Sequence, residues 1–209
     1  MDAMRIIIET GAKKEGHFVL TSDDKHTEYY LDKDAIYLHP VKTSLLARKI
    51  AEQYRDSGVE VVIGPAMGGI ILSQWVAYWL SKITGVEVLA VYAKKNENDK
   101  DFIIKRGYEK VINGKRILVV EDTLTTGGSV KKVVILVRAF GGEVVGVGAI
   151  GNRGGVTMAQ IANPPRLTAL INVEFKTWAE EDCPLCVQGI PVDANVGKGR
   201  EYLLKKEEK

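Results

Sequence analysis

Short runs of aliphatic and β-branched residues alternate along this chain with longer stretches in which apolar residues recur every three or four positions. The short runs are typical of buried strands, and the longer stretches have the period of amphipathic helices. Strands are predicted at residues 59–63, 86–92, 116–120, 143–150 and 167–173. Helices are predicted at residues 42–55, 70–83 and 129–140, and Gly85 follows the second helix where a terminating glycine is expected.

Strands that alternate with crossover helices indicate βαβ units, and therefore a parallel sheet with helices on both faces. We expect a single α/β domain over residues 1–209, built on a mainly five-stranded parallel sheet in residues 41–175. Residues 1–40 and 176–209 lie outside the alternating pattern. We expect them to be a small N-terminal segment and a C-terminal extension added to the core.

The composition is that of an ordinary globular protein. Of the 209 residues, 45% are hydrophobic and 27% are charged, which excludes a disordered, collagen-like or coiled-coil chain as an overall description. The apolar run near the N-terminus is too short for a signal peptide, and the longest one, at residues 70–80, is too short to span a membrane. We expect a soluble cytoplasmic protein that does not bind membranes.

The charge is nearly balanced overall but not locally. Lys and Arg number 29 against 27 Asp and Glu, a net charge of +2 that does not favour a nucleic-acid partner. Residues 93–116 hold eight Lys or Arg and four acids, a local excess of four positive charges. This basic segment begins where the second predicted strand ends.

The sequence VVEDTLTTGGSV, residues 119–130, joins the third predicted strand to the helix after it. Its glycines allow backbone N–H groups to converge, and the helix N-terminus adds a positive dipole end, so the turn suits a phosphate. The acids Glu121 and Asp122 suit the vicinal hydroxyls of a ribose. The combination with three threonines favours a phosphorylated-sugar site over a plain solvated turn.

The segment VVEDTLTTGGS resembles the phosphoribosyl diphosphate (PRPP) motif of type I phosphoribosyltransferases. Within that family, four other segments are similar to orotate phosphoribosyltransferase, and the resemblance, with its motifs in the same order, extends over nearly the whole chain. They are the N-terminal hood at residues 11–37, the pyrophosphate loop GPAMGGI at residues 64–70, NRGG at residues 152–155, and the ending CPLCVQGIP at residues 183–191.

The resemblance implies that Glu121 and Asp122 bind the ribose hydroxyls of PRPP, that the following turn binds its 5′-phosphate, and that the first glycine loop lies against its pyrophosphate. Many orotate enzymes have a lysine at the position of Gly68, so a plain glycine-rich turn remains an alternative for that loop. The implied PRPP-binding residues are Gly64, Pro65, Ala66, Met67, Gly68, Gly69, Glu121, Asp122, Thr123, Leu124, Thr125, Thr126, Gly127, Gly128 and Ser129.

In the family, a mobile basic loop closes over the pyrophosphate, often from the neighbouring subunit of a homodimer. The resemblance places Lys94 and Lys95 at the start of this loop. The following residues lack the family's spaced lysine and histidine, and Lys105 and Arg106 are preferred to Lys100 as the missing catalytic cations. A solvated charged hairpin is the alternative.

The base-binding residues implied by the resemblance are Ser22, Lys25, Tyr29, Tyr30, Thr125 and Arg153. A planar guanidinium pairs well with a carboxylate, so Arg153 is the best marker of a carboxylated base. The tyrosines could equally belong to a core, and Arg153 could be an ordinary surface residue. The hood also departs from the family at Thr21 and Asp23.

The resemblance implies transfer of the 5-phosphoribosyl group from PRPP to orotate, giving orotidine 5′-phosphate and pyrophosphate. Mg²⁺ would be held mainly through PRPP, with no direct protein ligand implied. Two alternatives remain: a phosphoribosyltransferase for another purine or pyrimidine base, and a non-catalytic regulator that senses PRPP. No helix-turn-helix segment supports the regulator.

The only two cysteines, Cys183 and Cys186, form a CxxC motif, which is half of a zinc ligand set. A zinc site would need a partner subunit or the histidines His17, His26 and His39, which lie far away in the sequence. A redox pair is a second possibility. Structural thiols in a C-terminal turn are the interpretation that the sequence favours.

Overall fold

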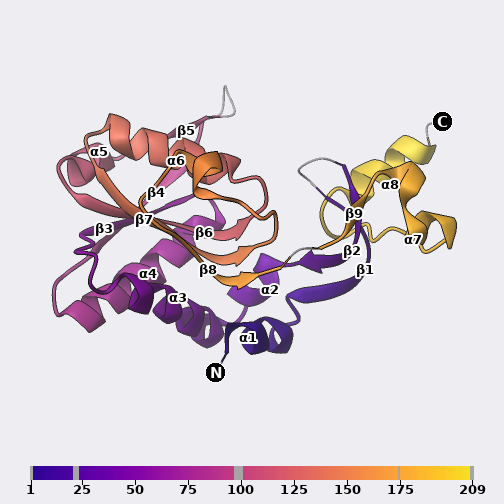
Figure 1. Cartoon of the computed structure of the whole chain (residues 1–209), viewed down its shortest axis with the longest axis horizontal. Helices are drawn as coiled ribbons and strands as arrows, with labels where there is room; N and C mark the ends of the chain where they lie inside the picture. The colour runs from indigo at the N-terminus through magenta and orange to yellow at the C-terminus, as the bar shows by residue number, and fades with distance from the viewer. Residues whose placement is uncertain (1, 21–23, 97–100, 174, 208–209) are drawn as a thin grey trace. The chain divides into compact units, whose positions relative to one another are not determined.

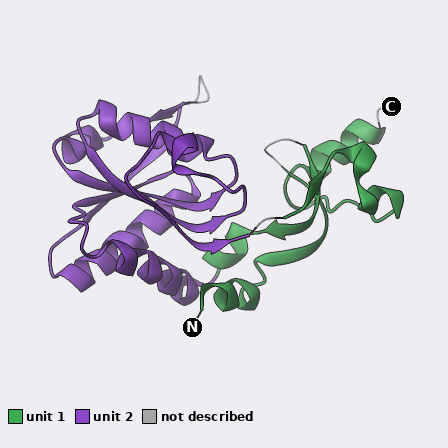
Figure 2. Cartoon of the chain, in the orientation of Figure 1, with its two compact units in different colours: residues 1–38, 174–209 green, residues 39–173 purple. Residues whose placement is uncertain are grey.

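The computed structural model describes residues 2–20, 24–96, 101–173 and 175–207. The chain divides into two compact units, one made of residues 39–173 and the other of residues 1–38 together with 174–209 (Figure 2). We call them the core unit and the terminal unit. The N-terminal segment and the C-terminal extension, which the sequence pattern treats as separate additions, therefore fold together.

The core unit is built on a six-stranded sheet with the order β5-β4-β3-β6-β7-β8 (Figure 1). Five strands are parallel, as predicted, and the short edge strand β5 is antiparallel to β4. The strands are β3 (Val61–Pro65), β4 (Leu89–Lys95), β5 (Phe102–Ile103), β6 (Arg116–Leu124), β7 (Glu143–Asn152) and β8 (Leu167–Asn172).

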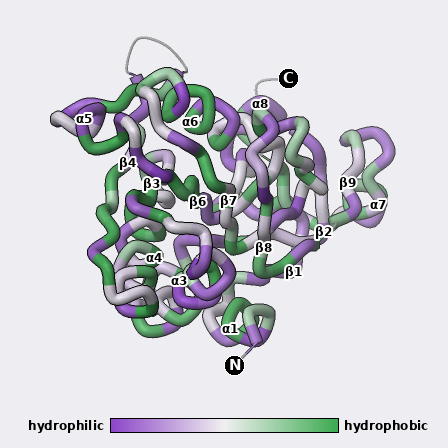
Figure 3. The backbone as a smooth tube through the Cα atoms, turned by 60° about the vertical axis from the view of Figure 1, so that its left-hand side comes forward, coloured by the Kyte–Doolittle hydropathy of each residue, from purple (hydrophilic) through white to green (hydrophobic). Residues whose placement is uncertain are grey.

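Helices cover both faces of this sheet, again as predicted (Figure 1). One face carries α3 (Pro40–Tyr54) and α4 (Gly68–Thr84), which pack against each other. The other carries α5 (Tyr108–Ile112), α6 (Gly128–Ala139) and the 3₁₀ helix η1 (Met158–Ile161). Apolar and polar residues alternate along the helices (Figure 3), and Gly85 ends α4 with a φ of 74°. Within the described ranges, no helix combines the length and the hydropathy that a membrane span requires.

The core between the sheet and α6 is aliphatic. Four valines at helical spacing on α6 are fully buried against the central strands; they are Val130, Val133, Val134 and Val137. On the opposite face, Tyr54 of α3 is fully buried, and its hydroxyl donates a hydrogen bond of 2.7 Å to the carbonyl of Val147. Burial raises the pKa of Tyr54, so this hydroxyl stays protonated. A Cβ at Gly146 would lie 2.5 Å from the Tyr54 ring, so glycine is required there.

The strand ends differ from the prediction in a way that affects the site. The sequence pattern ends the third strand at residue 120, because two acids follow it, but β6 continues to Leu124. Its last residues pair with β7, where Glu121 lies beside Ala149 and Leu124 beside Asn152. Glu121 and Asp122 therefore lie within the strand, where neighbouring side chains point to opposite faces.

The terminal unit consists of short elements that the sequence pattern does not predict. Its antiparallel sheet has the order β1-β2-β9, and β9 joins β2 through the pairs His26–Trp178 and Thr27–Thr177. The elements are α1 (Ala3–Glu9), β1 (Lys13–Val19), β2 (His26–Leu31), α2 (Lys33–Tyr37), β9 (Thr177–Trp178), η2 (Glu180–Asp182), α7 (Pro184–Val187) and α8 (Gly199–Glu207).

Candidate active site

The two glycine-rich loops follow two neighbouring strands of the core unit. β3 and β6 pair in parallel, so their carboxyl ends lie at the same edge of the sheet. From β3 the chain continues into α4 and on to β4, whereas from β6 it continues into α6, on the opposite face, and on to β7. Ligands of open α/β sheets bind in the crevice where the strand order reverses in this way.

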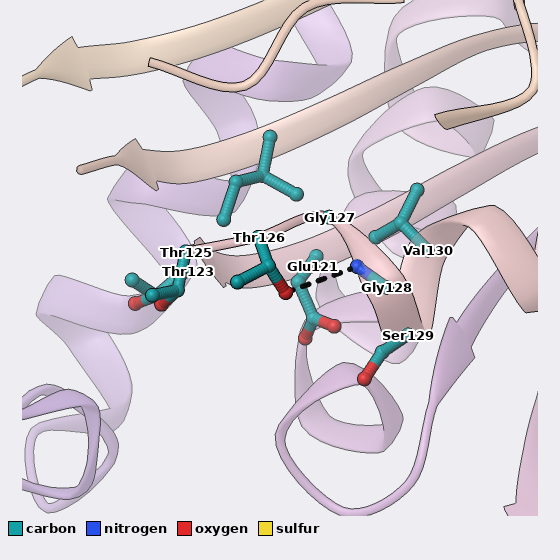
Figure 4. A pocket seen from close by; sticks show the side chains of 9 residues that line it. Glu121, Thr123, Thr125, Thr126, Gly127, Gly128, Ser129 and Val130 are labelled. Atoms are coloured by element: carbon teal, nitrogen blue, oxygen red, sulfur yellow. Dashed lines mark hydrogen bonds between the residues drawn. The ribbon is translucent and has the colours of Figure 1, made fainter. Parts of the chain in front are cut away.

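The loop between β6 and α6 borders an open hollow of about 330 Å³ (Figure 4). Most of the side chains around it carry hydroxyl groups, and one carries a carboxylate. In Figure 4, the carboxylate of Glu121 and the hydroxyl of Ser129 point to the same side of the loop. The lining residues are Glu121, Thr123, Leu124, Thr125, Thr126, Gly127, Gly128, Ser129 and Val130.

The conformation of this loop explains the first of its two glycines. Gly127 precedes α6 with a φ of 74°, and a Cβ there would lie 2.6 Å from the Ile161 side chain and 2.9 Å from that of Val156. The amide of Gly128 donates to the hydroxyl of Thr126 over 3.4 Å. The hollow thus lies at the N-terminus of a twelve-residue helix, whose first amides and dipole favour an anion.

The two acids of the motif occupy different environments. Glu121 is half-buried and lines the hollow, and its carboxylate accepts a hydrogen bond of 3.1 Å from the amide of Asp122. Asp122 is only 5% exposed and is not among the lining residues. The alternation of side chains along β6 separates the acids, so Glu121 is the one presented to a ligand in the hollow.

The loop from Gly64 to Gly69 folds tightly onto itself. A Cβ at Gly64 would lie 2.6 Å from the Cα of Gly69, and a Cβ at Gly69 would lie 2.8 Å from the Cα of Gly64. Both positions therefore need glycine. The loop includes a cis peptide bond between Ala66 and Met67, and it is tied to β4 where the amide of Ala66 donates to Ala93 over 2.8 Å. Gly68 and Gly69 then open the seventeen-residue helix α4.

Arg153 is held beside the hollow by the loop that follows β7. Its amide donates to the carbonyl of Leu124, and its Nε donates to the hydroxyl of Thr125, both over 3.0 Å. The buried side chain of Asn152 fastens this loop through two hydrogen bonds of 2.9 Å with the backbone of Val156. Sequence reasoning missed Asn152; its position before the NRGG arginine is the only signal that could have indicated it.

The basic residues are exposed and lie on two sides of a hairpin. Lys94 and Lys95 end β4, at the same edge of the sheet as the glycine loops. The antiparallel strand β5 then leads the chain away from that edge before Lys105 and Arg106, and Arg106 has a φ of 69°. These four residues do not line the hollow, and Lys100 lies outside the described residues.

The remaining base-binding candidates belong to the terminal unit. Lys25 is exposed, whereas Tyr29 and Tyr30 are half-buried on β2, and Ser22 lies outside the described residues. The Tyr29 ring lies 5.5 Å from that of Phe175, and the Tyr30 ring 5.6 Å from that of Phe18. Both tyrosines therefore have packing partners within their own unit.

Comparison with known proteins identifies relatives over most of the chain. A model of the phosphoribosyl transferase domain matches residues 33–182. The orotate phosphoribosyltransferase of Caldanaerobacter subterraneus subsp. tengcongensis is 41% identical over 85% of this chain and 87% of that protein. That of Pelotomaculum thermopropionicum is 41% identical over 91% of this chain and 93% of that protein. Among solved structures, Mycobacterium tuberculosis orotate phosphoribosyltransferase in complex with inorganic phosphate is 26% identical, with a TM-score of 0.63 over 82% of this chain and 95% of that one.

Proposed function

This chain belongs to the phosphoribosyltransferase family, and on that premise we propose that it transfers the 5-phosphoribosyl group of PRPP to orotate. The products are orotidine 5′-phosphate and pyrophosphate. The observation that carries the proposal is the hollow at the N-terminus of α6, where backbone amides, hydroxyls and one carboxylate are available to a phosphorylated sugar. The choice of orotate as the base follows the two 41% identical relatives, which are both named orotate phosphoribosyltransferase.

The reaction needs no covalent nucleophile. As the bond at the anomeric carbon of PRPP breaks, positive charge develops on the sugar and negative charge on the departing pyrophosphate. The chain's part is to position the sugar and the base and to stabilise the leaving group with backbone amides and cations. We assign the 5′-phosphate to Thr125–Ser129 and the pyrophosphate to the Gly64–Gly69 loop.

We assign the ribose hydroxyls to Glu121 and Asp122, with Glu121 making the contact from the hollow. Thr123 and Leu124 shape the wall next to it. The orotate carboxylate is assigned to Arg153, whose hydrogen bond to Thr125 places its guanidinium next to the phosphate loop. Ser22, Lys25, Tyr29 and Tyr30 remain predicted contacts to the base.

The basic segment supplies cations for the leaving group in this proposal. Lys94 and Lys95 begin it at the edge of the sheet that carries both glycine loops. Lys105 and Arg106 follow β5, so closure over the pyrophosphate would require the hairpin to move or a second copy of the chain to contribute its own. A homodimer acting in the cytoplasm is therefore part of the proposal.

Mg²⁺ fits the donors present. The hollow offers hydroxyl and carboxylate oxygens, which are the ligands Mg²⁺ prefers, and a single lining carboxylate suits an ion that retains water and substrate oxygens. The ion would be held mainly through PRPP, in the hollow that Glu121 lines. When bound, the ion neutralises charge on the pyrophosphate.

A pyrophosphate-release assay tests the proposal. The purified chain is incubated with PRPP, Mg²⁺ and, separately, orotate, uracil, adenine and hypoxanthine. Release with orotate alone is expected. Release with a different base would instead indicate a phosphoribosyltransferase for that base. PRPP binding without release of pyrophosphate would indicate the non-catalytic regulator.

Two variants test the assignment of the acids. We expect Glu121→Gln to lower kcat/KM for PRPP by about 100-fold or more, because it removes the carboxylate that faces the sugar, and Asp122→Asn to lower it as well, because it removes the buried charge next to that carboxylate. The matched control is Asp56→Asn, which removes an exposed acid of the same unit. Unchanged turnover in both variants, with circular dichroism unchanged, would remove the assignment of the ribose site.

A further inference from the structure

Four side chains that can bind metal converge inside the terminal unit. His17 comes from β1 and His26 from β2, while Cys183 precedes α7 and Cys186 lies within it. One potential ligand atom from each residue lies within 4.8 Å of all the others. Three of the four residues are buried and Cys186 is half-buried, so the cluster is an interior feature of the unit.

Three nitrogen–sulfur separations in the cluster match those of a tetrahedral ligand set, and all four ligand atoms lie within 4.8 Å of one another. With zinc–sulfur and zinc–nitrogen bonds of about 2.3 Å and 2.0–2.1 Å, neighbouring ligand atoms lie about 3.3–3.8 Å apart. The His17 Nε2 lies 3.6 Å from the Cys183 sulfur and 3.8 Å from the Cys186 sulfur, and the His26 Nδ1 lies 3.3 Å from the Cys186 sulfur. Only the 2.7 Å between the two histidine nitrogens is shorter, and it would lengthen by about 0.6 Å around an ion.

The surroundings orient the histidine that lies between the two sulfurs. The Nδ1 of His17 lies 2.7 Å from the carbonyl of Ile190, so the proton of a neutral ring sits on Nδ1 and donates to that oxygen. This leaves the lone pair of Nε2 facing the cysteines, as in metal sites whose histidines are oriented by a backbone carbonyl. The ring of Tyr202, edge-to-face at 5.0 Å, packs against His26.

We propose that His17, His26, Cys183 and Cys186 form a structural zinc site. Two thiolates and two imidazoles in a tetrahedron are a donor set that selects zinc over Mg²⁺, which prefers oxygen ligands. Four protein ligands leave no open position for a substrate, so the site is structural. It joins the β1–β2 hairpin to the C-terminal extension, which also pairs with β2 through β9 and donates backbone hydrogen bonds to His17 and Val19 of β1.

The sequence favours structural thiols because Cys183 is 166 residues from His17. The fold removes that separation, and each cysteine sulfur faces a histidine nitrogen within 3.6 Å. Binding zinc would displace the thiol protons and give the buried nitrogens and sulfurs a common partner. The site is independent of the proposed transferase activity.

The test measures zinc in the full-length chain, produced without a histidine tag in zinc-supplemented medium. We expect one zinc ion per chain by inductively coupled plasma mass spectrometry. The zinc content per chain of the double variant Cys183→Ala/Cys186→Ala should be lower by tenfold or more. The control His39→Gln, which removes the remaining histidine, should keep it, since His39 is exposed and outside the cluster.

Cobalt(II) provides a second measurement on the unaltered chain, in case the double variant does not fold. Exchange of zinc for cobalt should give the intense visible bands of tetrahedral cobalt and a sulfur-to-cobalt charge-transfer band. A zinc-free chain without these bands would overturn the proposal. So would zinc retained by a folded double variant, or a Cys183–Cys186 disulfide, detected as the loss of two hydrogens, in freshly purified protein.

Discussion

The core unit and the terminal unit fill their interiors with different chemistry. Between its sheet and its helices, the core unit buries aliphatic side chains, and its few buried polar groups include Tyr54 and Asn152, whose hydrogen bonds are satisfied. The terminal unit buries fewer aliphatic residues and places His17, His26 and Cys183 among them. A unit as small as the terminal unit buries little apolar surface for its stability, and a metal cross-link is one way to compensate for this.

The tryptophans allow the two units to be followed separately. Trp75 and Trp79 lie on α4 of the core unit, and Trp178 lies on β9 of the terminal unit. A Trp178→Phe variant reports on the core unit by fluorescence, and a Trp75→Phe/Trp79→Phe variant reports on the terminal unit. This pair of variants distinguishes unfolding of the core unit from unfolding of the terminal unit.

The largest expected effect follows from metal removal and rests on the proposed zinc site. Structural zinc contributes an apparent free energy of about 10–16 kcal/mol, which exceeds the stability of most small domains. A strong chelator should therefore unfold the terminal unit without denaturant, seen as a change in Trp178 fluorescence. The signal of Trp75 and Trp79 should stay constant. Equal loss of both signals would show that the two units do not differ in this respect.

A cavity in the aliphatic core should destabilise the core unit and leave the terminal unit folded. Ile63 is fully buried on the central strand β3, so Ile63→Ala should lower the free energy of unfolding of the core unit by about 2–5 kcal/mol. Urea denaturation followed by Trp75 and Trp79 measures it. The control Ile135→Ala, which is 51% exposed, should change the value by less than about 0.5 kcal/mol. A similar loss in both variants would contradict the assignment of stability to this core.

The buried hydroxyl of Tyr54 is a polar group inside the core unit, and removing it measures how much its hydrogen bonds contribute to stability. Tyr54→Phe removes the hydroxyl that donates to the carbonyl of Val147, and a loss of about 1–3 kcal/mol in the free energy of unfolding is expected in the same urea experiment. The hydroxyl of Thr168 also loses its acceptor. Tyr78→Phe is the matched control, because Tyr78 is 47% exposed. Equal stability of the two variants would mean that the Tyr54 hydroxyl contributes nothing.

The smallest effect is expected at the surface. Arg48 and Glu52 form an ion pair of 2.9 Å, one helical turn apart on α3. Glu52→Gln should lower the free energy of unfolding by about 0.3–0.5 kcal/mol at low salt and by almost nothing in 1 M salt, where charges are screened. Glu87→Gln, at another exposed glutamate, is the control. A loss that persists in 1 M salt would indicate packing, not charge.

The sheet and its helices could be predicted because each strand and helix carries its own apolar pattern. The exact end of β6 could not, because Glu121 and Asp122 look like loop residues although the backbone of the strand continues to pair with β7. The terminal unit could not be predicted for a similar reason. Its two-residue strand β9 has too short a pattern, and it forms only because β2 offers a partner.

The candidate site also has one part that contiguous sequence indicates and another part that depends on the assembled fold. The sequence predicts a phosphate-binding turn in these residues because TTGGS carries the amides and hydroxyls in one stretch of chain, and the same stretch borders the hollow. The position of Asp122 away from the lining depends on strand alternation, and the support of Arg153 by Asn152 depends on the loop after β7. Contacts of this kind arise only when the elements are assembled.

The division of the chain has a consequence for its synthesis. Residues 39–173 form one uninterrupted stretch, so the whole core unit is synthesised before residues 174–209 are added to the chain. The β1–β2 hairpin, although made first, receives its third strand and its two cysteines only from residues 177–186. The β1–β2 hairpin is therefore completed only after the core unit has been synthesised, and a chain that stops before residue 177 lacks the strand and the cysteines that lie against its two histidines.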